Sequence, residues 1–345
     1  MMAELPIAIV LLVFACAGGV ICVSGVFMTG LADKLADRTG LGEAIVGGVI
    51  LGAATSLSGT VVSVTAALDG RASLAFSNSV GGIAAQTAFL AFADLMFRRA
   101  NLEHAAAEVT NIVQGILLVL LLLIPMAALV TPEFTILAIH PASFLIPVIY
   151  IAGLFVCRSV QEEPMWRPVK TKETREDTPD DEDEKTASKT TLRLGLEFGG
   201  LMAVMGLSGW LIAQSGSALT DRLGISASLV GALLTATVTS LPELVTTLAA
   251  VRRGALQLAV GGIIGGNTFD TLFLTAADVS YRDGSLYHAA TNQDYFWVVT
   301  AALMTTCLLA GLVVRERSGP AGIGFDSLSL LGIYLGAIAL QVLAF

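Results

Sequence analysis

Apolar residues dominate the chain in ten long blocks, separated by short polar or charged stretches. A run of about eighteen or more apolar residues can cross a bilayer as a helix, whereas membrane barrel strands show short segments of alternating hydrophobicity. The pattern therefore predicts an all-α integral membrane protein with ten transmembrane helices. The predicted helices lie at residues 5–29, 41–68, 72–97, 109–130, 134–158, 192–216, 225–251, 255–279, 293–314 and 323–345.

Composition supports a membrane protein and excludes an ordinary soluble enzyme. Of the 345 residues, 55% are hydrophobic and 14% are charged, whereas soluble domains carry about 25% charged residues. The basic residues form no continuous face, so nucleic acid is not an expected partner. The expected partner is the lipid bilayer, and the sequence leaves the oligomeric state open.

One long polar segment, residues 159–190, divides the chain. Ten of the chain's 28 acidic residues lie between Glu162 and Glu184, so more than a third of the acidic residues fall in this one segment. A stretch with so few apolar residues does not bury enough surface to fold alone. We expect a flexible cytoplasmic linker between a first transmembrane repeat at 1–158 and a second at 191–345. Its acidic run is either a solvated spacer or a regulatory cation-binding segment.

The distribution of Lys and Arg predicts the orientation. With the N-terminus outside, the inner loops hold 16 of the 19 basic residues and the outer loops only Arg71, Arg222 and Arg282. Cytoplasmic loops of membrane proteins carry such an excess of positive charge. The protein is therefore expected to be a multi-pass plasma membrane protein with the acidic linker in the cytoplasm.

The two halves are copies of one another. Residues 35–90 align without gaps on residues 219–274, at an offset of 184, and about a third of the positions are identical. Each half has five predicted helices, and because five is odd, the second copy must be inserted upside down. Inverted-topology repeats of this kind are typical of secondary transporters, which bind substrate where the repeats meet.

The seventh predicted helix carries a carboxylate that needs a partner. Glu243 lies well inside an apolar block, where a charge costs roughly 2.5–3.5 kcal/mol on insertion scales. Pro242 has no N–H and therefore frees a backbone carbonyl one turn earlier. Hydroxyl, carbonyl and carboxylate oxygens suit Na⁺ or Ca²⁺. The polar positions that fall on one helical face here are Thr235, Thr239, Glu243, Thr246 and Thr247.

The eighth predicted helix supplies a second carboxylate, Asp270, which follows Glu243 by 27 residues. Across a tight helical hairpin the two acids would converge on one site, where their proximity favours a proton on one of them. In the first copy, Thr55 and Ser56 are retained, but Gly59 stands opposite Glu243 and Gln86 opposite Asp270. The predicted site is therefore lopsided, with its charge in the second half.

At these residues the sequence resembles a known family. TSLPELVTT followed by GGIIGGNTFDTLF resembles the second alpha repeat of the sodium/calcium exchanger family, of the Ca²⁺:cation antiporter superfamily. The resemblance implies that Glu243 and Asp270 are the central cation ligands, for Na⁺ or Ca²⁺. It implies a site shared by side chains and backbone of both repeats. The implied cation-binding residues are Glu243, Asp270, Thr239, Ser240, Ala236 through its carbonyl, Asn267, Gly266, Thr55, Ser56 and Gln86.

Gly59 is the main departure from the family, which generally has a glutamate there, and Gly266 stands where a serine is common. The resemblance implies a secondary active antiporter that exchanges Na⁺ or H⁺ for Ca²⁺ or another cation, and the lost glutamate leaves a monovalent Na⁺(K⁺)/H⁺ antiporter as an alternative. A transport-inactive scaffold or sensor is a second alternative. No enzyme motif and no cofactor are expected, beyond the transported Na⁺, Ca²⁺ or H⁺.

Other acidic residues lie close to the ends of the apolar blocks. We expect them to reach interfacial water rather than to serve a site. They are Glu43, Asp94, Glu108, Glu197, Asp278 and Asp326.

Overall fold

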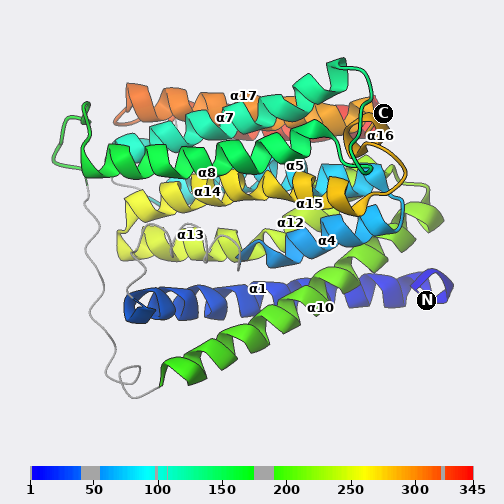
Figure 1. The fold of residues 1–345 in the computed structure, drawn as a ribbon. Helices are drawn as coiled ribbons and strands as arrows, with labels where there is room; N and C mark the ends of the chain where they lie inside the picture. The colour runs from blue at the N-terminus through cyan, green and yellow to red at the C-terminus, as the bar shows by residue number, and fades with distance from the viewer. Residues whose placement is uncertain are drawn as a thin grey trace.

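The structure, a computed structural model, describes residues 2–39, 55–97, 100–106, 108–174, 190–319 and 323–344. Apart from one bridge between Ile136 and Ile139, the regular structure in these ranges is helical (Figure 1). The longer helices are α1 (Ile7–Thr39), α4 (Leu57–Leu68), α5 (Ala72–Met96), α7 (Val109–Val130), α8 (Pro141–Glu162), α10 (Thr191–Leu223), α13 (Leu241–Arg253), α14 (Leu256–Asp270), α15 (Leu272–Ser280), α17 (Asn292–Val314) and α18 (Phe325–Leu343). The shorter ones are η1 (Met2–Glu4), α6 (Leu102–Ala105), α11 (Ala227–Leu229), the π-helix η3 (Val230–Thr235), α12 (Ala236–Thr239) and α16 (Leu286–Ala289).

The prediction of an all-helical membrane protein is confirmed. Seven of the described helices are long and apolar enough to cross a membrane, and a pair bent by 46°, Ala227–Thr239 with Leu241–Arg253, would make eight. Three of the ten predicted spans differ in detail, and one of them, the block at 225–251, is divided into α11, η3, α12 and α13. Only α4 is described from the block at 41–68, and the block at 255–279 is divided at Thr271 into α14 and α15.

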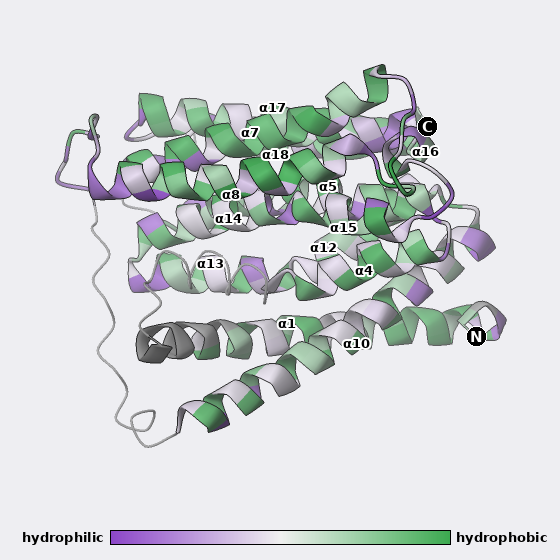
Figure 2. Cartoon of the chain, viewed as in Figure 1, coloured by the Kyte–Doolittle hydropathy of each residue, from purple (hydrophilic) through white to green (hydrophobic). Residues whose placement is uncertain are grey.

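The outer surface of the bundle is apolar. Hydrophobic residues predominate along the helices, and hydrophilic residues gather towards the two ends and in the loops (Figure 2). Large side chains such as Leu12, Phe27, Phe155 and Leu207 are exposed. In water these side chains would be unfavourable, but a surrounding bilayer accommodates them.

The helices repeat at the offset found in the sequence. The helices α1, α4, α5, α6, α7 and α8 each begin 184 positions before α10, α13, α14, α16, α17 and α18, within one residue. The repeat therefore extends well beyond the segment that the sequence aligns. Helix α1 starts at the end of the bundle where the N-terminus lies, whereas α10 starts at the opposite end (Figure 1). These two helices pack along each other in opposite directions, as an inverted repeat requires.

Two acids that we expected at interfacial water are buried caps instead. Asp94 and Asp278 are counterparts in the repeat, and both are fully buried. The carboxylate of Asp94 accepts the N–H of Leu102 at 2.7 Å, and that of Asp278 accepts the N–H of Leu286 at 2.9 Å. Asp326, at the start of α18, is also buried. Carboxylates at helix N-termini satisfy N–H groups that have no partner within the helix.

The described start of the polar linker lies against the bundle. The guanidinium of Arg315 donates to the carbonyl of Val169 at 2.5 Å, and Arg317 forms an ion pair with Glu173 at 2.7 Å. The remainder of the predicted flexible linker, residues 175–189, lies outside the described residues. The boundaries of the two repeats and the linker stay predictions.

Close backbone packing at the centre gives a direct test of the fold. A Cβ on Gly81 of α5 would overlap the Cα of Ala232 in η3, whereas a Cβ on Gly262 of α14 would meet no atom within 4 Å. We expect Gly81→Ala to lower the midpoint of thermal unfolding in detergent, because overpacking costs about 1–3 kcal/mol. Gly262→Ala is the control and should be neutral or stabilising, because alanine favours a helix by roughly 0.5–1 kcal/mol over glycine. Equal midpoints for the two variants would contradict this packing.

Candidate cation-binding site

A helix break in the second repeat and the start of α4 in the first position the predicted site residues. In the second repeat the chain bends at Ser240, between α12 and α13, and Pro242 lies in the first turn of α13. In the first repeat the counterpart Ser56 lies directly before α4. Because a helix break leaves backbone groups without intrahelical partners, polar groups concentrate at such points. The predicted single helical face of the seventh block is therefore wrong, since a π-helix and this break divide it.

Two glycines bring neighbouring helices close to these breaks. A Cβ on Gly25 of α1 would overlap the ring of Pro242, and a Cβ on Gly209 of α10 would lie 2.6 Å from the carbonyl oxygen of Ser58. Gly25 and Gly209 are counterparts in the repeat, as are Ser58 and Pro242. Each of the two antiparallel helices thus covers the break that belongs to the opposite half.

The carboxylate of Asp270 connects both halves of the chain. It accepts the hydroxyl of Ser56 at 2.6 Å and the amide of Gln86 at 2.7 Å. The same amide nitrogen of Gln86 also donates to the hydroxyl of Ser240 at 3.1 Å. All four side chains are buried. Two of the four come from each repeat, so the structure brings together residues that are 154 or more positions apart.

Glu243 is the second buried carboxylate of the site. Its side chain is 6% exposed, it forms a hydrogen bond with the side chain of Thr55, and it interacts electrostatically with Asp270. Burial and this interaction agree with the predicted convergence of the two acids, which stays a prediction. Since a buried charge is stable only when it is paired or well hydrogen-bonded, two carboxylates in this position require protons or cations.

Several acceptor oxygens here have no donor. Among the described residues, Glu243 Oε2, Gln86 Oε1 and Asn267 Oδ1 are buried and accept no hydrogen bond. Leaving a buried acceptor unsatisfied costs roughly 1–3 kcal/mol. Carboxylate and amide oxygens are hard ligands that suit Na⁺ or Ca²⁺. The donor set therefore fits a cation better than an anion or an apolar molecule.

Other predicted ligands already form hydrogen bonds to backbone or side-chain groups. The hydroxyl of Thr239 donates to the carbonyls of Thr235 and Ala236, and the Ala236 carbonyl also accepts the N–H of Ser240. The amide of Asn267 donates to the hydroxyl of Thr87 at 2.9 Å. Donation leaves the lone pairs of the Thr239 oxygen available for a cation, whereas the Ala236 carbonyl already accepts two hydrogen bonds.

Gly266, where the family commonly has serine, lies beside the site. A Cβ on Gly266 would lie 3.3 Å from Gln86 Oε1. Any side chain at this position would therefore contact an oxygen that accepts no hydrogen bond from the described residues. In the described ranges no group of three or more His, Cys, Asp and Glu is arranged to hold a metal ion. A cation here would thus depend on hydroxyl and amide oxygens as well as on the two acids.

Sequence reasoning missed two polar residues of α5. Asn78 accepts the hydroxyl of Thr235 at 2.7 Å and donates to the backbone carbonyl of Gly59. The hydroxyl of Ser79 donates to the backbone carbonyl of Asp270 at 2.9 Å. The signal was present as consecutive polar residues, Ser77 to Ser79, inside an apolar block. Their role depends on contacts with the second repeat, which the first repeat alone does not reveal.

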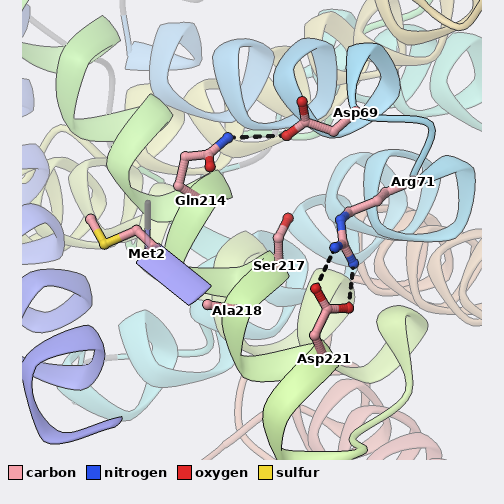
Figure 3. Close-up of a pocket in the computed structure, with 7 residues that line it drawn as sticks. All are labelled: Met2, Asp69, Arg71, Gln214, Ser217, Ala218 and Asp221. Atoms are coloured by element: carbon pink, nitrogen blue, oxygen red, sulfur yellow. Dashed lines mark hydrogen bonds and ion pairs between the residues drawn. The ribbon is translucent and has the colours of Figure 1, made fainter. Parts of the chain in front are cut away.

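A separate polar pocket of about 320 Å³ lies near the N-terminus, away from the two acids (Figure 3). Arg71, in the turn before α5, holds Asp221 of α10 through two hydrogen bonds of 2.9 and 2.5 Å. Asp69 of the same turn accepts the amide of Gln214 of α10 at 3.0 Å. These contacts tie α10 to the turn between α4 and α5. Exposed ion pairs of this kind contribute only about 0.2–1 kcal/mol.

Comparison with known proteins identifies a family and relatives. Residues 9–161 and 194–343 match the family described as sodium/calcium exchanger protein. The inner membrane protein YrbG of Escherichia coli is 28% identical over 129 residues, which are 37% of this chain and 38% of that protein. The putative antiporter CaxA of Alkalimonas amylolytica is 30% identical over 102 residues, 30% of this chain and 32% of that one. The aligned regions thus span about a third of these curated relatives.

Solved structures share the fold. The sodium-calcium exchanger NCX_Mj, soaked with Na⁺ and Sr²⁺, superposes with a TM-score of 0.62 at 15% identity over 97% of this chain and 99% of that chain. The H⁺/Ca²⁺ exchanger CAX superposes with a TM-score of 0.64 at 13% identity over 97% of this chain and 86% of that chain. At these identities the similarity is one of fold.

The hydrogen bonds of Asp270 give a matched pair of variants. Ser56→Ala removes the 2.6 Å bond to Asp270, and we expect a loss of about 1.5–3 kcal/mol in unfolding free energy, as for hydrogen bonds to charged groups. Ser58→Ala makes the same change two residues away, where the buried hydroxyl has no partner among the described residues. Thermal unfolding in detergent should therefore separate the two variants. A larger loss for Ser58→Ala would show that the Ser56 bond does not support Asp270.

Proposed function

Because the chain belongs to the sodium/calcium exchanger protein family, we propose that it is a secondary active cation antiporter. It exchanges Na⁺ or H⁺ for Ca²⁺ or another cation, which binds at Glu243 and Asp270. Alternating access exposes this site first to one side of the membrane and then to the other, as in other transporters built from inverted repeats.

One observation supports the proposal: two buried carboxylates influence each other electrostatically, residues of the first repeat bond to Asp270, and the Glu243 and Gln86 acceptor oxygens have no donor among the described residues. A cation would satisfy the Glu243 and Gln86 oxygens at once. It would also balance the negative charge that burial makes costly. The names of the similar proteins agree with this chemistry, since they include a sodium-calcium exchanger, an H⁺/Ca²⁺ exchanger and a putative antiporter.

The residues divide into ligands and positioning groups. Glu243 and Asp270 supply the charge, and the hydroxyls of Thr239 and Ser240 supply neutral oxygens from the second repeat. Three first-repeat residues reach the same acids, Thr55, Ser56 and Gln86. When a cation binds, Ser56 and Gln86 would hold the Asp270 carboxylate in place. Asn267 and Gly266 lie on the same helix as Asp270 and border the site.

A monovalent Na⁺/H⁺ or K⁺/H⁺ antiporter is the second candidate. Gly59 favours it, because the first repeat then contributes no carboxylate opposite Glu243. A transport-inactive scaffold is less well supported, since a protein without transport would have no use for two buried acids and their burial cost.

We also propose that the N-terminus is outside and the acidic linker is cytoplasmic in the plasma membrane, from the distribution of Lys and Arg.

Antiport in proteoliposomes tests the proposed function. With Na⁺ inside and Ca²⁺ outside, we expect Ca²⁺ uptake, followed with a calcium dye, or a coupled internal pH change, followed with a second dye. Glu243→Gln should slow the flux by at least about tenfold, because losing a charged ligand removes on the order of 1.5–3 kcal/mol. Glu162→Gln is the matched control, since Glu162 is exposed and, within the described part of the chain, forms an ion pair with Arg158 one turn away.

The possible results separate the candidates. Ca²⁺ uptake that Glu243→Gln abolishes supports exchange of a divalent cation. A Na⁺-coupled pH change without Ca²⁺ uptake supports the monovalent antiporter. Equal flux in both glutamine variants, or no flux of Na⁺, K⁺, H⁺ or Ca²⁺ by folded protein, would rule out transport through this site.

A further inference from the structure

Gly59 is one of two positions where the first half of the site lacks an acid that the second half has, and the other is Gln86, opposite Asp270. This glycine is the counterpart of Glu243 in the repeat, and it lies in the first turn of α4. A Cβ built on it would lie 2.7 Å from Cε2 and 3.3 Å from Cζ of Phe273, and 3.6 Å from the hydroxyl oxygen of Thr239. A side chain at position 59 would therefore start inside the cation site, in space that the Phe273 ring now holds.

The ring of Phe273 is firmly held. Its side chain is 4% exposed, and it contacts Phe269 edge to face, with ring centroids 6.4 Å apart. Phe269 in turn meets Tyr150 of α8 in the same arrangement at 6.1 Å. A ring that packs against other aromatic rings in this way does not move aside without losing contacts, because protein interiors are close-packed. A longer side chain at Gly59 would thus clash rather than displace the ring.

The number of carboxylates sets the charge that the site can carry. Among the described residues, Glu243 and Asp270 are the acids of the site, and both come from the second repeat. One divalent cation, or two monovalent cations or protons, would balance their charge. Surplus charge in a low-dielectric site is costly, so occupied states with balanced charge are favoured.

We propose that Phe273 is a specificity-determining residue: its ring occupies the volume of a third carboxylate and limits the site to two negative charges, so that exchange is electroneutral. The inference rests on the proposed antiport function and adds its charge balance. It applies to any ion pair, since two protons, two Na⁺ or one Ca²⁺ each match the two acids.

Restoring the missing carboxylate tests this inference. Gly59→Glu alone should lower the thermal midpoint strongly, because the new side chain overlaps the ring. Gly59→Glu combined with Phe273→Ala gives the carboxylate room and should recover much of that midpoint. Gly59→Gln with Phe273→Ala is the matched control, with the same size and no added charge. The test compares wild type and the two double variants in proteoliposomes.

The readout is the steady-state accumulation of the transported cation at zero membrane potential and at 100 mV, set with valinomycin and K⁺. Moving one net charge per cycle across 100 mV shifts the accumulation ratio by roughly fifty-fold. We expect no shift for wild type and for the Gly59→Gln double variant, and a clear shift for the Gly59→Glu double variant. A shift in wild type, or equal behaviour of the two double variants, would overturn the proposal.

A binding measurement keeps this test independent of the proposed function. Na⁺ titrations followed by thermal stabilisation report binding in the same three proteins without transport. The thermal midpoint of the Gly59→Glu double variant should rise more steeply with Na⁺ concentration than the midpoint of its glutamine control. Identical slopes would overturn the role of Phe273. Different slopes without any flux would support that role and overturn the antiport function alone.

Discussion

The structure depends on holding two carboxylates inside a membrane bundle. Each such charge costs roughly 2.5–3.5 kcal/mol at the centre of a bilayer, so the surrounding elements must offset it. The carboxylate of Asp270 accepts hydrogen bonds from Ser56 and Gln86, and Glu243 forms a hydrogen bond with Thr55. The helix breaks bring these groups together. The remaining acceptor oxygens are the ones that a transported cation would satisfy.

The inverted repeat explains why donors and acids face one another. The helices of each half begin at matching positions 184 residues apart, and the counterparts Ser56 and Ser240 bond to Asp270 and Gln86, respectively. Glycines 25 and 209 then let α1 and α10 approach the break of the other half. Divergence between the copies placed the charge in one half and the supporting hydroxyl and amide groups in the other. Phe273 completes this asymmetry by filling the space beside Gly59.

Much of this arrangement was predictable from the sequence. Apolar block lengths gave the helical membrane fold, and matching positions revealed the repeat. The isolated acids Glu243 and Asp270 stood out because charge is rare inside such blocks. The packing of Phe273 on Gly59 was not predictable, since a phenylalanine in an apolar helix carries no sign of its neighbour. The capping roles of Asp94 and Asp278 were missed for a similar reason: their partners lie beyond the loop, and position near a span end suggested water.

The most direct test of the account is to locate a bound cation. A crystal structure of the protein soaked with Sr²⁺ or Ba²⁺ would show the ion as an anomalous peak. We expect a peak at the distances of oxygen ligands, roughly 2.3–2.6 Å for a Ca²⁺-sized ion, from Glu243 and from Asp270 or Gln86. A peak only in the pocket between Asp69 and Asp221, or none near Glu243, would contradict it.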